Sequence, residues 1–215
     1  MHKYLLFDLD GTLTDSKEGI TNSIVHSLTQ MNITVPDNNA LVHFIGPPLK
    51  ESFRTDYHLE GEQNEQAIAF YREYFSTRGL FENEVYSDIP ELLSDLKNAG
   101  YKLYVATSKP VTFARQILDH FELTDYFEMI AGSELDGSRS HKADVIQYVI
   151  EENHLSPADC LMIGDRKHDL IGADMNGMDA LGVLFGYGSR EELASYPHIA
   201  LISTVHSLRQ FLLTA

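Results

Sequence analysis

Two carboxylates follow the first apolar segment of this 215-residue chain. The segment Tyr4–Phe7 leads directly into Asp8 and Asp10, which are separated by a single leucine. A buried strand gains no stability from such a pair, because desolvating each charge costs several kcal/mol unless another group compensates it. The pair therefore indicates a site whose chemistry requires carboxylates and whose neighbours supply a compensating charge.

Further polar side chains stand after two other apolar segments and at the start of a helical pattern. They are Thr107, Ser108 and Lys109 after LYVA, Asp165 and Asp169 after CLMI, and Lys142 at the start of KADVIQYVI. Each alone has an ordinary explanation as a turn or cap residue. In doubly wound sheets, however, ligands bind beyond the carboxyl ends of the strands. We therefore expect these side chains to share one edge of a sheet.

Short and nearly continuous apolar segments predict the strands of that sheet. They are YLLF, KLYVAT, EMIAG, CLMIG and LGVLFG, and this texture is typical of parallel strands covered by helices on both faces. Helical patterns such as PELLSDLKNAG and KADVIQYVIEENHL lie between them. From about Asp88 onward the two patterns alternate, which predicts an α/β fold with a doubly wound, Rossmann-like parallel sheet.

Residues 16–82 interrupt this alternation. Three helical patterns fill them, GITNSIVHSLTQM, NALVHFIGPPLKESF and NEQAIAFYREYFSTRG, and none supplies a strand. We expect a small all-helical cap domain over 16–82, inserted into an α/β core formed by 1–15 and 83–215. The hinges would be Thr14–Lys17 and the polar stretch FENEVYSD.

The motifs together resemble the signature of the haloacid dehalogenase superfamily. DLDGTLTD is similar to the first motif, VATS to the second, Lys142 in SHKADVI to the third, and GDRKHDLIGA to the fourth. All four occur in order, and the resemblance covers the whole chain. The helical insertion is similar to the cap of the phosphoglycolate phosphatase-like and 5′-nucleotidase-like branch. Asp10 separates this chain from dehalogenase relatives, whose corresponding motif lacks the second aspartate, and favours phosphate transfer.

This resemblance implies a Mg²⁺-dependent phosphatase that acts on small phosphate monoesters through an aspartyl-phosphate. It implies Asp8 as the nucleophile, Asp10 as the general acid and base, and Lys142 as the group that offsets negative charge. Hydrogen bonds to the phosphoryl group would come from Thr107 and from the amides of Gly11 and Ser108. The expected Mg²⁺ ligands are the Asp8 and Asp165 carboxylates and the Asp10 carbonyl, with Asp169 as an outer-shell or alternative ligand.

Two cations of the cap follow a turn forced by the segment GPP. Lys50 and Arg54 lie one helical turn apart, and in similar proteins this segment faces the active site. Arg54 is the better candidate for gripping the distal part of a substrate, because its planar fork suits a carboxylate or phosphate. Both could instead be solvated surface cations. Lys109 likewise either adds positive charge near the phosphate or points to solvent.

Composition limits the partners of the chain. A formal net charge of −16 argues against a nucleic acid polymer or an anionic membrane, since both reward a basic face. The single cysteine, Cys160, cannot form an internal disulfide, and the first apolar run is too short for a signal peptide. We therefore expect a cytoplasmic protein, monomeric or homodimeric. The resemblance to the phosphatase branch implies phosphoglycolate or nucleoside 5′-monophosphates as substrates. A non-catalytic phosphate or nucleotide sensor and a phosphomutase of sugar phosphates remain alternatives.

Overall fold

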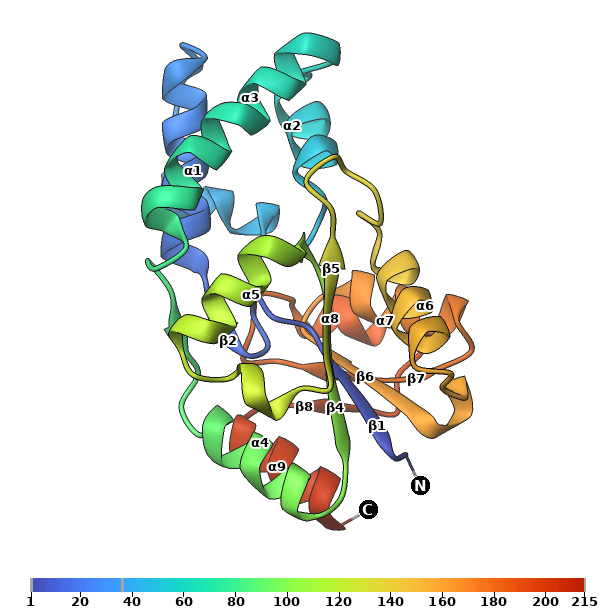
Figure 1. Ribbon diagram of the computed structural model, residues 1–215. Coiled ribbons are helices and arrows are strands. Elements are labelled where there is room, and N and C mark those ends of the chain that lie inside the picture. Colours follow the sequence, from blue (N-terminus) through green and yellow to red (C-terminus); the bar gives the residue numbers. More distant parts are fainter. Residues whose placement is uncertain (1, 36, 215) are drawn as a thin grey trace. The chain divides into compact units, whose positions relative to one another are not determined.

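A computed structural model describes residues 2–35 and 37–214 of the chain (Figure 1). The chain divides into two compact units. Met1–Thr14 together with Val85–Ala215 form the first, which we call the core unit, and Asp15–Glu84 form the second, the inserted unit. Each helix of the described residues is too short or too polar to traverse a bilayer.

The core unit is built on a six-stranded sheet. Its strands are β1 (Tyr4–Phe7), β4 (Lys102–Pro110), β5 (Met129–Ser133), β6 (Cys160–Gly164), β7 (Asp179–Val183) and β8 (Ala200–Ile202). They lie in the order β5-β4-β1-β6-β7-β8, and each neighbouring pair is parallel. This confirms the predicted doubly wound sheet. Because β1 lies between β4 and β6, the strand order reverses around it, which is where such sheets bind ligands.

Register aligns the ends of these three central strands. Phe7 pairs with Val105 on one side and with Ile163 on the other. The residues that follow these positions are Asp8, Ala106 and Gly164. The residues of the first, second and fourth motifs therefore lie side by side at one edge of the sheet, although they are far apart in the sequence.

Helices cover both faces of the sheet, as Figure 1 shows, with α6 and α7 on one side and α4, α5 and α9 on the other. The helices of the core unit are α4 (Ile89–Asn98), α5 (Val111–His120), α6 (Lys142–Glu152), α7 (Lys167–Met175), α8 (Arg190–Ala194) and α9 (Val205–Thr214), with short 3₁₀ turns η3 (Thr124–Tyr126) and η4 (Pro157–Asp159). Leu6 and Met162 of the sheet pack against Val145 and Val149 of α6. Cys160 is fully buried in the same cluster, as its place in an apolar strand predicts.

Two strand predictions need correction. LGVLFG was expected to be a strand throughout, but β7 ends at Val183, so the segment Leu184–Gly186 lies beyond the strand. The strand β8 was not predicted, because its three residues carry too little pattern to stand out from a loop.

The inserted unit is helical. Its elements are α1 (Lys17–Gln30), η1 (Asn38–Phe44), α2 (Leu49–Tyr57), α3 (Gly61–Tyr74) and the π-helical turn η2 (Phe75–Gly79). The turn predicted at GPP separates the 3₁₀ helix η1 from α2, because Gly46 takes a φ of 109° and prolines follow it. Short strands β2 (Thr14–Asp15) and β3 (Glu84–Val85) pair where the chain enters and leaves this unit.

Candidate active site

Asp8 lies at the carboxyl end of β1 and is almost completely buried. Its N–H donates to the Ile163 carbonyl at 2.9 Å, which continues the pairing of β1 with β6 for one residue beyond the strand. Its Oδ1 accepts the Leu9 N–H at 2.7 Å. The backbone on both sides thus fixes where this carboxylate stands.

Lys142, the first residue of α6, supplies the compensating charge. Its Nζ lies 2.7 Å from Asp8 Oδ1 and 2.8 Å from Asp169 Oδ1, and it donates to the Ala106 carbonyl at 2.9 Å. An ammonium group has three donors, so these three contacts use all of them. Burial alone would lower the pKa of Lys142, but Asp169 and Asp8 outweigh burial and raise that pKa above its usual range. The lysine is therefore a permanent cation of the site.

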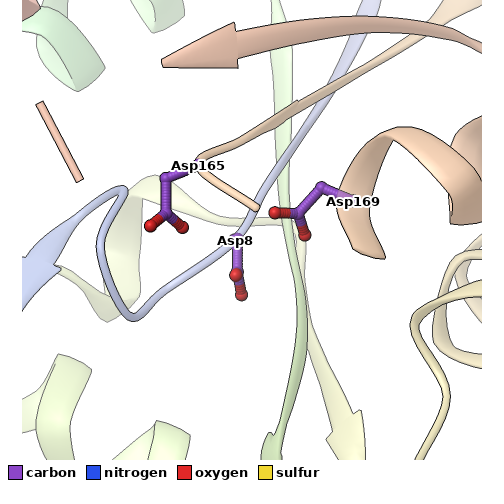
Figure 2. A group of neighbouring side chains, drawn as sticks. All are labelled: Asp8, Asp165 and Asp169. Carbon is purple, nitrogen blue, oxygen red and sulfur yellow. The ribbon is translucent and has the colours of Figure 1, made fainter. Parts of the chain in front are cut away.

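Asp8, Asp165 and Asp169 form a buried acidic cluster, which Figure 2 shows. Each offers an oxygen, and the three oxygens lie within 4.8 Å of one another. Burial, followed by the charges of Asp169 and Asp8, raises the pKa of Asp165 well above its ordinary value. Burial likewise raises the pKa of Asp169 to about 6, although Lys142 acts in the opposite direction. Three carboxylates facing one ammonium leave an excess of negative charge.

This cluster fits a divalent cation. All of its donors are carboxylate oxygens, which Mg²⁺ prefers. Within the described residues Asp165 Oδ1 is buried and has no hydrogen-bond partner, which is costly unless a ligand takes up the oxygen. The carboxylate of Asp10 is not part of this cluster. The Mg²⁺ ligand predicted for Asp10 is its backbone carbonyl.

Asp10 pairs with a different cation. Lys109 Nζ lies 3.1 Å from Asp10 Oδ2, and both side chains are largely buried. Lys109 therefore points toward the motif residues and not to solvent, and its contribution of positive charge near a phosphate stays a prediction. Within the described residues Asp10 Oδ1 is buried and without a hydrogen-bond partner. One oxygen of this carboxylate is therefore held by a cation, and the other is available to a ligand.

The end of β4 supplies hydroxyl and backbone groups. Thr107 is buried, and its Oγ1 accepts the Lys109 N–H at 3.2 Å, which leaves the hydroxyl proton free to be donated. Ser108 is half-buried, and its carbonyl accepts the Ser133 hydroxyl at 2.8 Å, which ties this end of β4 to β5.

The backbone N–H of Gly11 has a different hydrogen-bond partner from the one expected. Its N–H, predicted to donate to a phosphoryl group, donates to the Thr14 carbonyl at 2.8 Å. Its φ of +82° lies in the left-handed region, and a Cβ built there would stand 2.3 Å from Asp165 Oδ2. Glycine is thus required both for the turn after β1 and for the close approach to the fourth motif.

Lys50 and Arg54 of α2 are both exposed on the inserted unit. Their expected contact with substrate stays a prediction. Sequence analysis missed the loop after β7, where the Tyr187 N–H donates to Asp165 Oδ2 at 2.7 Å. The sequence signal for this loop is the pair of glycines that flank Tyr187, immediately after an apolar segment.

The sequence model described as haloacid dehalogenase-like hydrolase matches residues 5–183 of the chain. A 5′-nucleotidase of Pseudomonas aeruginosa is 47% identical over 97% of this chain and 94% of its own length. The tyrosine-protein kinase PtkA of Mycobacterium tuberculosis is 40% identical over 97% of this chain and 72% of its own length. A phosphoglycolate phosphatase of Colwellia psychrerythraea is 28% identical over 89% of this chain and 88% of its own.

Among solved structures, a predicted phosphatase from Clostridium acetobutylicum superposes with a TM-score of 0.97 and is 48% identical, with both chains fully covered. The similarity therefore extends over both units of the chain, including the helical insertion.

Proposed function

The chain belongs to the haloacid dehalogenase-like hydrolase family, and from this premise we propose that it is a Mg²⁺-dependent phosphatase of small organic phosphate monoesters. The observation that carries the proposal is the contact of 2.7 Å between Lys142 Nζ and Asp8 Oδ1, beside the carboxylates of Asp165 and Asp169. A buried, charge-compensated carboxylate of this kind is a nucleophile that can approach a phosphate dianion.

The reaction has two steps, and both use the first motif. A carboxylate oxygen of Asp8 bonds to phosphorus, the bond from phosphorus to the leaving oxygen breaks, and Asp10 gives its proton to that oxygen. Water then bonds to the phosphorus of the aspartyl-phosphate while Asp10 takes up a proton of the water. The bond between Asp8 and phosphorus breaks, inorganic phosphate leaves, and both carboxyl groups return to their starting states.

The remaining residues of the site bind the phosphoryl group and the metal and neutralise negative charge. Lys142 offsets the charge on Asp8, and Lys109 keeps Asp10 in place. The Thr107 hydroxyl and the Ser108 amide would donate to the phosphoryl oxygens. Asp8, Asp165 and the Asp10 carbonyl would hold Mg²⁺, with Asp169 beside them; the bound ion supplies positive charge that lowers the repulsion between carboxylate and phosphate.

For the substrate we propose phosphoglycolate or a nucleoside 5′-monophosphate. The support is the name of the relative that is 47% identical, a 5′-nucleotidase, and that of a more distant phosphoglycolate phosphatase. The net charge of −16 opposes any anionic substrate at long range, so binding must depend on local cations. We assign Arg54 of the proposed cap to the distal part of the substrate, because its guanidinium can bind an anion through two hydrogen bonds.

The test is a panel of phosphorylated metabolites with the purified chain, followed as phosphate release with Mg²⁺ or with EDTA. We expect Mg²⁺-dependent turnover of small monoesters and a hydroxylamine-labile phosphoryl label on the protein. Asp8→Asn should lower kcat by more than about 10⁴-fold, the scale on which loss of a nucleophile acts. Asp144→Asn, an exposed aspartate on α6, is the matched control and should keep full activity.

Three results would contradict the proposal. Turnover by Asp8→Asn would show that Asp8 is not the nucleophile. Turnover unchanged by EDTA would show that the reaction does not need a divalent metal. Phosphate binding without turnover of any compound would favour the sensor. Including ATP with a tyrosine peptide in the panel also shows whether the phosphoryl group passes to a tyrosine hydroxyl, as the name of the mycobacterial relative suggests testing.

A further inference from the structure

The segment Gly186–Tyr187–Gly188 follows β7 and closes around Asp165 of the fourth motif. We infer that Gly11, Gly186 and Gly188 form a positioning element, the glycine cage, which holds Asp165 so that only its Oδ1 is presented to the metal. This inference rests on the proposed function, because it assigns a task to residues around the proposed metal site. It goes further in that none of the four motifs includes the loop after β7.

The space around Asp165 admits no side chain at these positions. A Cβ built on Gly186 would lie 2.2 Å from the Gly11 carbonyl oxygen and 2.4 Å from Asp165 Cβ. A Cβ built on Gly188 would lie 2.0 Å from the Asp165 carbonyl oxygen. Real Cβ atoms essentially never approach within 3.0 Å of another heavy atom. At both Gly186 and Gly188 the shortest of these contacts is with a backbone oxygen, which cannot move away as a flexible side-chain end could.

Conformational freedom does not explain the two glycines after β7. Gly186 and Gly188 are absent from the described residues with positive φ, whereas Gly11 is among them. An alanine could therefore adopt the backbone angles of either residue. What the positions require is the absence of a side chain, and the groups that would be displaced are Asp165 and the Gly11 carbonyl.

The same loop decides which oxygen of Asp165 is available. The Tyr187 N–H donates to Oδ2 at 2.7 Å, while Oδ1 is buried and, within the described part of the chain, has no hydrogen-bond partner. Asp165 is completely buried beside two other carboxylates, which repel it. Without the cage this side chain could turn away from its neighbours, and metal binding would have to reverse that movement. With the cage, Oδ1 is fixed beforehand, and fixing a ligand through its surroundings is worth about 10- to 100-fold in metal affinity.

The chain offers a matched control on β7, the strand that leads into this loop. Gly182 of β7 is also tightly packed and also lacks a positive φ, but a Cβ there would meet the side-chain ends of Leu201 and Leu193 and not Asp165. Gly182→Ala therefore adds the same methyl group to the same region and perturbs the core without touching the acidic cluster.

The experiment measures Mg²⁺ affinity from the rise in Tm with Mg²⁺ concentration, in the full chain and without substrate. Gly186→Ala and Gly188→Ala should each weaken Mg²⁺ binding by at least 10-fold, while Gly182→Ala should stay within about two-fold of wild type. Wild-type affinity in both cage variants would overturn the glycine cage and leave the proposed function standing. A wild-type chain without any Mg²⁺ response would overturn the metal site, and the cage with it.

If the alanine variants do not fold, a second measurement tests whether the Tyr187 amide holds Asp165. Amide hydrogen exchange at Tyr187 should be at least 10-fold faster in Asp165→Ala than in the wild type, because the acceptor of this N–H is lost. Exchange at Tyr187 that is equally fast in both proteins would show that the amide does not hold Asp165, and would overturn the inference.

Discussion

Lys142 Nζ lies 2.7 Å from Asp8 Oδ1, so the first residue of α6 neutralises the first carboxylate after β1. The same ammonium lies 2.8 Å from Asp169 Oδ1. A single buried cation thus links the first and fourth motifs. Because the lysine is buried and its loss would leave two buried carboxylates without their partner, its removal should affect stability as well as activity.

Lys142→Met is expected to abolish phosphatase activity and to lower the free energy of unfolding by about 3–5 kcal/mol in EDTA, since it leaves buried carboxylates without their partner. Chemical denaturation followed by circular dichroism measures this change. Lys3→Met removes an exposed lysine that lies 4.0 Å from Asp159 and should cost less than about 1 kcal/mol. Equal costs for the two variants would show that the buried contact adds nothing.

Asp10→Asn tests proton transfer to the leaving group. An asparagine cannot donate a carboxylic proton, so a substrate with a basic alkoxide leaving group should lose about 10²–10⁴-fold in kcat. p-Nitrophenyl phosphate should lose much less, because nitrophenolate leaves without protonation. Comparison of kcat for the two substrates in wild type and variant gives the result. Equal losses for both would mean that Asp10 does not act as the acid in the first step.

The acidic cluster makes a prediction about pH. Burial raises the pKa of Asp169 to about 6 in the folded chain, above the ordinary value of 3.8, and the pKa of Asp165 shifts in the same direction. The folded state therefore binds more protons than the unfolded state, and the cluster's contribution to stability falls as pH rises through this window. Mg²⁺ competes with those protons.

The rise in Tm caused by a fixed Mg²⁺ concentration should consequently be small near pH 5 and larger near pH 7. Differential scanning fluorimetry with Mg²⁺ or EDTA at each pH measures it. Asp169→Asn removes one of the titrating groups and should flatten the dependence. A Mg²⁺ effect that is greater at pH 5 than at pH 7 would contradict this assignment of charge.

Arg54→Ala tests the cation assigned to the substrate. If the guanidinium binds the distal anion, KM for phosphoglycolate should rise about 10-fold or more, while Tm stays unchanged because Arg54 is exposed. Lys50→Ala, four residues earlier on the same helix, is the matched control and should have the smaller effect. An unchanged KM for every good substrate would make Arg54 an ordinary surface residue.

The residue pattern predicted five of the six strands of the sheet and the carboxylates of the acidic cluster. Continuous apolar segments specify buried parallel strands, and the parallel arrangement brings the strand ends to one edge. Asp8 and Asp165 each lie immediately beyond a strand predicted with its observed bounds, so local pattern sufficed to place them together. Lys142 could be placed for the same reason, since it begins a strongly patterned helix.

The partners of Lys109 and of the Gly11 N–H depend on tertiary packing. Lys109 could have faced solvent, and its contact with Asp10 depends on how the side chains pack beyond the ends of β1 and β4. The N–H of Gly11 donates to a carbonyl within a turn, and the loop after β7 reaches Asp165 at the end of the neighbouring strand β6. Such contacts join segments distant in sequence, so they depend on strand register and on space left by neighbours. Local propensity and residue spacing do not specify strand register or the space that neighbouring groups leave.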